Sequence, residues 1–236
     1  MITIAAAGLR IGLDTQSETA RYFCRRFLAD GEPELTVAAT AEQIAAEQRL
    51  TGGRAEMAEL TCLYRALAER LPELDRFVLH GATVQIGGKA YIFTAKSGTG
   101  KSTHIRLWMD RFGEAVKIVN GDKPILWKRA DGWYACGTPW CGKEGLTSTD
   151  CVSVGGLCFL ERAQENSIRP AQPEEIAERI FHQVYRPVDR AQMERFLELL
   201  DDFLTRTPCW RMGCNMDPAA AECSYAAMTG QGAGIP

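Results

Sequence analysis

Residues 91–103 read YIFTAKSGTGKST, and they constrain the fold more than any other segment of the chain. Its second half matches the phosphate-binding pattern G-x-x-x-x-G-K-[ST] at every position except the first, where Ala95 replaces glycine. The glycines let successive backbone N–H groups converge on phosphate oxygens, the lysine adds a cation and the last hydroxyl binds Mg²⁺. We therefore assign nucleotide binding to consecutive residues of this loop: Ser97, Gly98, Thr99, Gly100, Lys101, Ser102 and Thr103.

The segments on either side of this loop are the ones that the motif requires. Residues 91–94 form an apolar, β-prone run, which predicts a strand. Beyond the loop, Ile105, Trp108 and Phe112 recur at helical spacing, and Gly113 predicts the end of that helix. Strand, loop and helix in this order favour a nucleotide site over the alternative, a flexible Gly/Ser loop that contains a lysine.

The composition is that of an ordinary globular protein, with 46% hydrophobic and 24% charged residues among 236. A net charge of −3 gives no general attraction to nucleic acids or anionic membranes, so we expect neither as a partner. No apolar run approaches the ~18 residues of a membrane span. The N-terminus lacks a basic region followed by an apolar core. We therefore expect a cytoplasmic protein.

Nine cysteines are many for a cytoplasmic chain, and the number is odd. Most of them lie in apolar runs, so we expect reduced, buried thiols that act as small hydrophobic side chains. A structural zinc site is the alternative, because the same spacing separates Cys136 from Cys141 and Cys209 from Cys214.

The pattern divides the chain into a small lobe, a core and a tail. Residues 1–72 predict an N-terminal α+β lobe, a scaffold or recognition module, with a helix over 54–71. Residues 73–230 predict a P-loop kinase-like core that ends in a helical part, and 231–236 a loose tail. Because a hairpin at Gly87-Gly88 precedes the loop and strand pairs follow its helix, we predict an α/β fold with a mixed sheet.

Two residues outside the loop are candidates for chemistry. Asp122 follows the apolar run 115–119, and a phosphate-binding loop needs an acid at a nearby strand end to hold Mg²⁺. The alternative is a turn aspartate in the sequence Asn-Gly-Asp. His80 ends a predicted strand just before the hairpin, where a partly buried structural histidine is the alternative.

Together these motifs resemble the HPr kinase/phosphorylase and ATP-dependent phosphoenolpyruvate carboxykinase group. The resemblance rests on His80-Gly81, the hairpin, residues 97–103 and Gly121-Asp122, and it covers residues 77–160. It implies a mixed-sheet kinase core, ATP on residues 97–103, and Mg²⁺ on Ser102 and Asp122. It also implies catalytic roles for Lys101, for His80 near the transferred phosphate, and for Asp122 as an alternative base.

The chain departs from that group in one respect. Both families carry paired aspartates where this chain has Gly121-Asp122, so one carboxylate is missing. The metal and base roles cannot then both fall to Asp122, and a weak or inactive enzyme is one outcome. Glu144 is a candidate for a compensating acid from elsewhere in the chain.

A second candidate region is the glycine-bounded loop over residues 137–145. We interpret it as a substrate loop in which Lys143 meets a phosphate and Trp140 covers a base or a peptide, with Thr138 and Glu144 beside them. The alternative is an ordinary connection between strands that packs its tryptophan.

The leading hypothesis is an ATP- and Mg²⁺-dependent phosphotransferase that moves the γ-phosphate to a hydroxyl acceptor, such as a serine of a peptide or small protein. The alternative is a catalytically weak nucleotide sensor or a module that binds a peptide or partner. A homo-oligomer is compatible with the sequence, which does not identify the acceptor.

Overall fold

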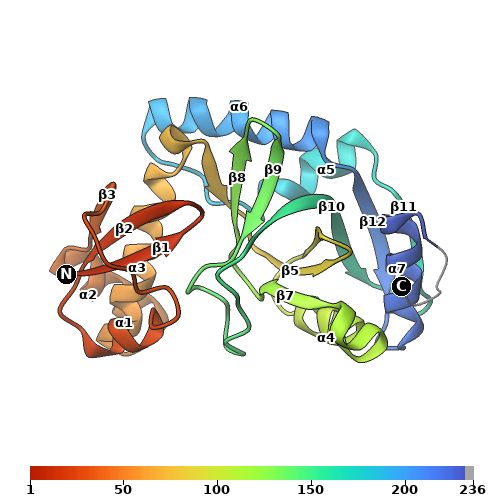
Figure 1. The fold of residues 1–236 in the computed structure, drawn as a ribbon, viewed down its shortest axis with the longest axis horizontal. Coiled ribbons are helices and arrows are strands. Elements are labelled where there is room, and N and C mark those ends of the chain that lie inside the picture. Colours follow the sequence, from red (N-terminus) through yellow and green to blue (C-terminus); the bar gives the residue numbers. More distant parts are fainter. Residues whose placement is uncertain (232–236) are drawn as a thin grey trace.

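The computed structural model describes residues 1–231 and contains a three-stranded sheet beside a nine-stranded one (Figure 1). Apart from residue 231, the tail that we expected to be loose lies outside the described residues. Among those residues, none of the helices combines the length and the apolar character that a membrane crossing requires.

The N-terminal part is built on the small sheet. Strands β1 (Ile2–Ala6) and β2 (Leu9–Asp14) form an antiparallel hairpin, and β3 (Leu35–Ala38) lies parallel to β2. Helices α1 (Glu18–Phe23), α2 (Ala41–Thr51) and α3 (Ala55–Arg70) accompany this sheet. The buried leucines of α3 pack against β1 and β2, because they recur at three- and four-residue steps along one helix face.

The large sheet runs in the order β4-β8-β9-β10-β6-β5-β7, and β12 adds to β10 and β11 to β12. It is mixed, as predicted, since β10 lies parallel to β6 and β12 and antiparallel to β9. The strand bounds are as follows: β4 (Arg76–Val78), β5 (Gly81–Ile86), β6 (Lys89–Thr94), β7 (Lys117–Asn120), β8 (Ile125–Arg129), β9 (Gly132–Cys136), β10 (Cys151–Arg162), β11 (Ser167–Pro170) and β12 (Cys209–Cys214).

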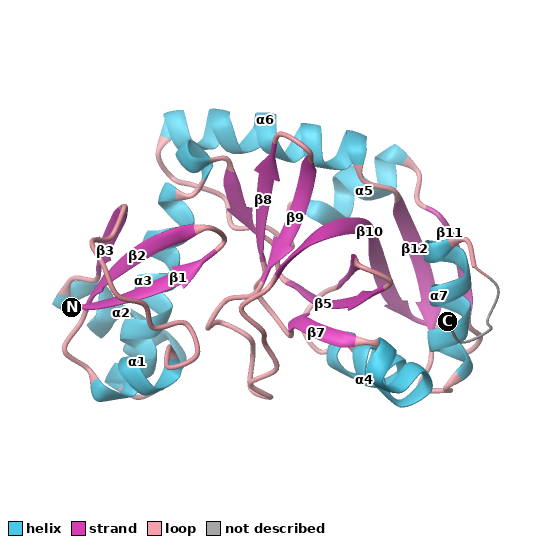
Figure 2. Ribbon diagram, viewed as in Figure 1, coloured by secondary structure: helices cyan, strands magenta, loops and turns pink. Residues whose placement is uncertain are grey.

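Helices cover both faces of the large sheet (Figure 2). Alternate residues of a strand point to opposite faces, so Phe93 of β6 packs on Trp108 of α4 (Lys101–Phe112) while Ile92 joins the cluster under α6 (Arg190–Arg206). Helix α7 (Ala219–Thr229) lies on the α4 side and α5 (Pro173–Ile180) on the α6 side. Short 3₁₀ turns follow α3 and α4, over Pro72–Leu74 and Gly113–Ala115.

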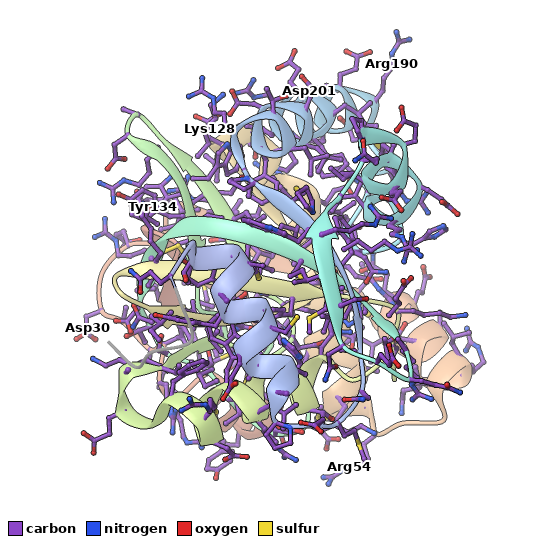
Figure 3. The ribbon with its side chains drawn as sticks, turned by 90° about the vertical axis from the view of Figure 1, so that its right-hand side faces the viewer. Asp30, Arg54, Lys128, Tyr134, Arg190 and Asp201 are labelled. Carbon is purple, nitrogen blue, oxygen red and sulfur yellow. A yellow bond between two sulfur atoms is a disulfide. The ribbon has the colours of Figure 1, made fainter. Side chains whose placement is uncertain are left out.

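The C-terminal part is less helical than we expected. Besides three helices it contributes β11 and β12, and β12 pairs in parallel with the second half of β10. Four of the six residues of β12 are half-buried, and the strand includes an arginine and a glycine, so it lacks the apolar signal of a central strand. On the surface, the charged side chains of Arg190 and Asp201 lie on the outer side of α6 (Figure 3).

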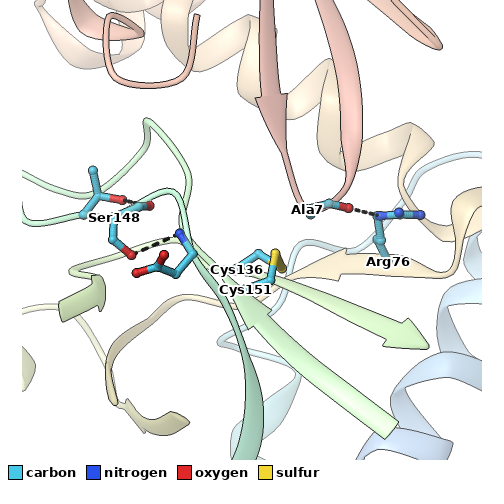
Figure 4. Close-up of a disulfide and its surroundings, with 7 residues drawn as sticks. Ala7, Arg76, Cys136, Ser148 and Cys151 are labelled. Carbon is cyan, nitrogen blue, oxygen red and sulfur yellow. Dashed lines mark hydrogen bonds between the residues drawn. A yellow bond between two sulfur atoms is a disulfide. The ribbon is translucent and has the colours of Figure 1, made fainter. Parts of the chain in front are cut away.

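The two sheets share one hydrophobic cluster, which joins β1 and β2 to Val78, Ile125 and Trp140. Two long-range hydrogen bonds reinforce this junction. The Arg76 Nε donates to the Ala7 carbonyl at 2.8 Å (Figure 4), and the Trp140 Nε1 donates to the Leu60 carbonyl at 3.0 Å. The loop after β9 therefore ties the core to α3.

Cys136 and Cys151 form a disulfide between facing residues of β9 and β10 (Figure 4). The expectation of reduced cysteines is therefore wrong for these two. The zinc alternative is wrong as well, because the disulfide engages Cys136 and no group of three or more His, Cys, Asp or Glu side chains within residues 1–231 is placed to hold a metal ion. The remaining seven cysteines are free thiols, and four of them are buried.

Candidate active site

The glycine-rich loop leaves the end of β6 and runs directly into α4. Gly98 has a φ of +78° and Gly100 a φ of +125°, values that side chains on L residues rarely adopt. A Cβ atom at either position would meet nothing within 4 Å, so the loop presents open space above its backbone. The two glycines are therefore needed for the shape of the loop and not for close packing.

The backbone N–H groups of the loop are unused. Apart from Thr99, whose N–H donates to the Lys96 carbonyl at 3.2 Å, no N–H of residues 97–103 donates to another group in the described part of the chain. Three of these N–H groups belong to the first turn of α4, whose positive end also faces the loop. Free N–H groups around open space are what binding of a phosphate requires.

Lys101 lies beneath this loop. Its side chain is buried, with 8% exposed, and its Nζ donates to the Ala95 carbonyl at 2.9 Å. Burial lowers the pKa of Lys101, and the nearby negative charge of Asp122 partly offsets that shift. Because the Lys101 ammonium already contacts the loop through the Ala95 carbonyl, it can exchange this oxygen for an oxygen of a phosphate bound to the same loop.

A turn anchored on Asn120 places Asp122 after β7. The Asn120 Oδ1 accepts the N–H groups of Asp122 at 2.9 Å and Lys123 at 2.7 Å. The Asn120 Nδ2 donates to the Thr138 carbonyl at 3.0 Å, which ties the turn to the next loop. Asp122 therefore is a turn residue, and the turn leaves its carboxylate free to face His80.

His80 and Asp122 form a pair, with 3.1 Å between the His80 Nε2 and the Asp122 Oδ1. The ammonium of Lys123 contacts the other carboxylate oxygen. Burial raises the pKa of Asp122, but the hydrogen bonds from His80 and Lys123 outweigh it and leave the pKa at about 2. Asp122 is therefore ionised at neutral pH and is a weak proton acceptor.

A cavity of about 750 Å³ lies between the loop and the end of β10. Residues 94–97 and Thr99 line it together with His80, residues 159–162 and the residues at and just after the end of α5. The Arg162 Nη2 donates to the Gly98 carbonyl at 2.6 Å, so a second cation contacts the loop. Sequence analysis missed Arg162, because only the parallel pairing of β10 with β6 brings it there.

The candidate substrate loop does not line this cavity. Trp140 is buried, and its indole packs on Tyr64 with 5.7 Å between ring centroids. Thr138 is 1% exposed and accepts a hydrogen bond from Asn120 at 3.1 Å. Both side chains support the fold, whereas Lys143 is exposed and Glu144 pairs with Arg106 of α4 at 3.0 Å.

The chain offers two oxygen donors to a divalent cation, the Ser102 hydroxyl and the Asp122 carboxylate. Ser102 makes no side-chain hydrogen bond within residues 1–231 and lies in the first turn of α4. Hard oxygen donors of this kind, completed by phosphate oxygens and water, suit Mg²⁺. The residues present therefore fit a metal that arrives with a nucleotide, and the Asp122 carboxylate must release Lys123 to bind it directly.

No family model matches the chain, and none of the curated proteins matches it. Among solved structures, the HPr(Ser) kinase/phosphatase from Coxiella burnetii matches with 11% sequence identity and a TM-score of 0.29, over 54% of this chain and 88% of that one. A likeness at this level does not establish a shared fold, so the family resemblance stays a hypothesis.

Proposed function

We propose that this chain is an ATP- and Mg²⁺-dependent phosphotransferase that moves the γ-phosphate to a hydroxyl acceptor, such as a serine of a peptide or small protein. One observation carries the proposal. Apart from that of Thr99, the N–H groups of residues 97–103 have no partner among the described residues, and this loop borders a cavity that His80 also lines. An anion of the size of a triphosphate satisfies these donors, and the rest of the cavity remains for an acceptor.

Each side chain then has a role that its surroundings support. Lys101, once it leaves the Ala95 carbonyl, neutralises charge on the transferring phosphoryl group. His80 accepts the proton of the acceptor hydroxyl, because it lines the cavity, whereas the Asp122 carboxylate is paired with His80 and Lys123. Asp122 orients His80 and, with Ser102, would hold Mg²⁺. When bound there, Mg²⁺ would neutralise part of the negative charge of the phosphates.

A transfer assay tests this assignment. Protein is incubated with Mg²⁺, γ-³²P-labelled ATP and a pool of serine- and threonine-containing peptides, and labelled phosphoserine is measured. We expect transfer by the wild type and a loss of at least about 100-fold in Asp122→Asn and His80→Gln. Asp131→Asn is the matched control, because Asp131 is exposed and lies outside the cavity. Equal transfer by Asp122→Asn and the wild type would contradict the assignment.

A nucleotide-binding module without transfer activity is the second candidate. The observation that favours it is Gly121, since the position has no room for a second carboxylate. Both candidates require nucleotide binding, so binding does not separate them. The second candidate predicts that the wild type binds ATP but forms neither labelled peptide nor labelled inorganic phosphate in the assay above. The first candidate predicts labelled peptide.

A further inference from the structure

We propose that the part of the cavity lined by the end of α5 and the residues after it binds the phosphoryl acceptor, and that Gln183 and Arg179 recognise a peptide group beside the acceptor hydroxyl. This inference rests on the phosphotransferase function proposed above and names the class of acceptor. Arg179 lies in the last turn of α5, and Gln183 follows the end of that helix. Both side chains line the same cavity as residues 95–97.

Gln183 has an acceptor atom with no donor. The residue is 7% exposed, and its Oε1 is buried without a hydrogen-bond partner anywhere in residues 1–231. Its backbone is fixed, since its carbonyl accepts the His80 N–H at 2.6 Å and its N–H donates to the Ile180 carbonyl at 2.8 Å. A buried acceptor without a donor costs about 1–3 kcal/mol, so its presence beside His80 indicates a group that a ligand satisfies.

Arg179 supplies the complementary group. Its Nη2 donates to the Glu161 Oε2 at 3.1 Å, while its Nε is buried and has no partner among the described residues. An unused donor and an unused acceptor therefore belong to two residues, four positions apart, that line the same cavity. A peptide group presents one C=O and one N–H, and so can satisfy both.

The size of the cavity limits how the acceptor enters. A volume of about 750 Å³ lies within the range of about 300–1,000 Å³ for small-molecule sites. It holds nucleotide phosphates and one amino-acid residue, and the remainder of the acceptor stays outside it. The acceptor therefore enters as one hydroxyl residue of a flexible peptide, with its side chain directed across the cavity toward the loop.

A titration with N-acetyl-L-serinamide tests the subsite. This probe carries the hydroxyl and the flanking amides of a serine residue and nothing else. ¹⁵N-labelled protein is saturated with Mg²⁺ and a non-hydrolysable ATP analogue, and the side-chain amide of Gln183 is followed by NMR. We expect a saturable shift, and an apparent affinity that falls about fivefold or more in Gln183→Met. Gln192→Met on α6, outside the cavity, is the matched control and retains the wild-type affinity.

Three results would overturn the subsite. The first is that the Gln183 amide of the wild type does not shift, an outcome that does not depend on the folding of any variant. The second is an unchanged affinity in Gln183→Met. The third is an equal effect of glycerol, which lacks a peptide group. If the ATP analogue binds in the same samples, such a result leaves the proposed function intact. If the analogue itself does not bind, the proposed function fails instead.

Discussion

A Cβ atom on Gly121 would lie 2.8 Å from the backbone oxygen of Cys141, and 3.2 Å from that of Leu146. Carbon and oxygen atoms in folded proteins keep a greater distance, so the position admits only glycine unless the loop moves. The loop after β9 thus occupies the space beside Gly121, the position that corresponds to the first aspartate of the pair in the families that the sequence resembles. The backbone of Cys141 and Leu146 therefore leaves no room for a second carboxylate at this turn.

Substituting Gly121 therefore will not supply a second acid. We expect Gly121→Asp to lower the free energy of unfolding by about 1–3 kcal/mol, because backbone atoms of the loop must shift to admit the Cβ. Phosphoryl transfer should fall, since the displaced loop carries the Thr138 carbonyl that Asn120 holds. Urea unfolding and the transfer assay measure the two effects.

Gly121→Ala is the control for that substitution, because it adds the Cβ without the charge. Similar destabilisation by Ala and Asp assigns the effect to packing. A Gly121→Asp protein with wild-type stability and higher activity would show that the loop accommodates the added side chain. Packing would then not be what excludes a second carboxylate at this position.

Trp140 should matter for the junction between the two sheets and not for nucleotide binding. We expect Trp140→Ala to cost about 3–5 kcal/mol, because it empties a buried site and removes the hydrogen bond to the Leu60 carbonyl. The milder Trp140→Phe should keep the affinity for ATP within about twofold, measured by calorimetry. A large loss of affinity in Trp140→Phe with unchanged stability would place the indole on the ligand instead.

The Cys136–Cys151 disulfide closes a loop with a sequence separation of 15 residues. In the chain-entropy model a loop of this length contributes about 3 kcal/mol. We expect the double variant Cys136→Ser/Cys151→Ser to lose stability of this order in urea, and the wild type to approach it after reduction. Titration of nine free thiols in unreduced, denatured protein would contradict the bond.

Stability should fall at alkaline pH through Cys24. Burial raises the pKa of this thiol from 9.0 to about 12. The raised value belongs to the folded state, so its contribution is complete below pH ~9 and declines as the pH rises toward 12, by about 1.4 kcal/mol per unit. Unfolding of the wild type and Cys24→Ala at pH 7.5 and pH 10 tests this, because the other groups cancel. A difference between the two proteins that does not change with pH would exclude the effect.

Contiguous signals in the sequence predicted the central features of the fold. The loop at residues 97–103, its strand and its helix are one unbroken motif, and the Gly87-Gly88 hairpin is a two-residue signal. Helix α2 was missed, although Thr40 and Gln43 form a capping box that the sequence displays. Strand β12 was missed because its partly exposed residues lack a clear period.

The rest of the candidate site depends on pairings that no local pattern contains. Arg162 reaches the loop only because β10 lies parallel to β6, and Gln183 reaches His80 through a single backbone bridge. The Cys136–Cys151 bond likewise follows from the register of β9 on β10. Trp140 looked like a binding residue because a tryptophan in a glycine-rich loop gives no hint that α3 covers it.

The proposed function requires that the backbone of residues 97–103, together with Lys101, binds a nucleoside triphosphate. Calorimetric titration of Mg²⁺·ATP into the wild type and Lys101→Ala measures this binding, with Lys89→Ala, at an exposed lysine on β6, as the control. We predict binding by the wild type and by Lys89→Ala, and a loss of at least about tenfold in Lys101→Ala, the effect of one charge-assisted hydrogen bond. No binding by the wild type at millimolar ATP, or equal affinity in Lys101→Ala, would contradict the account.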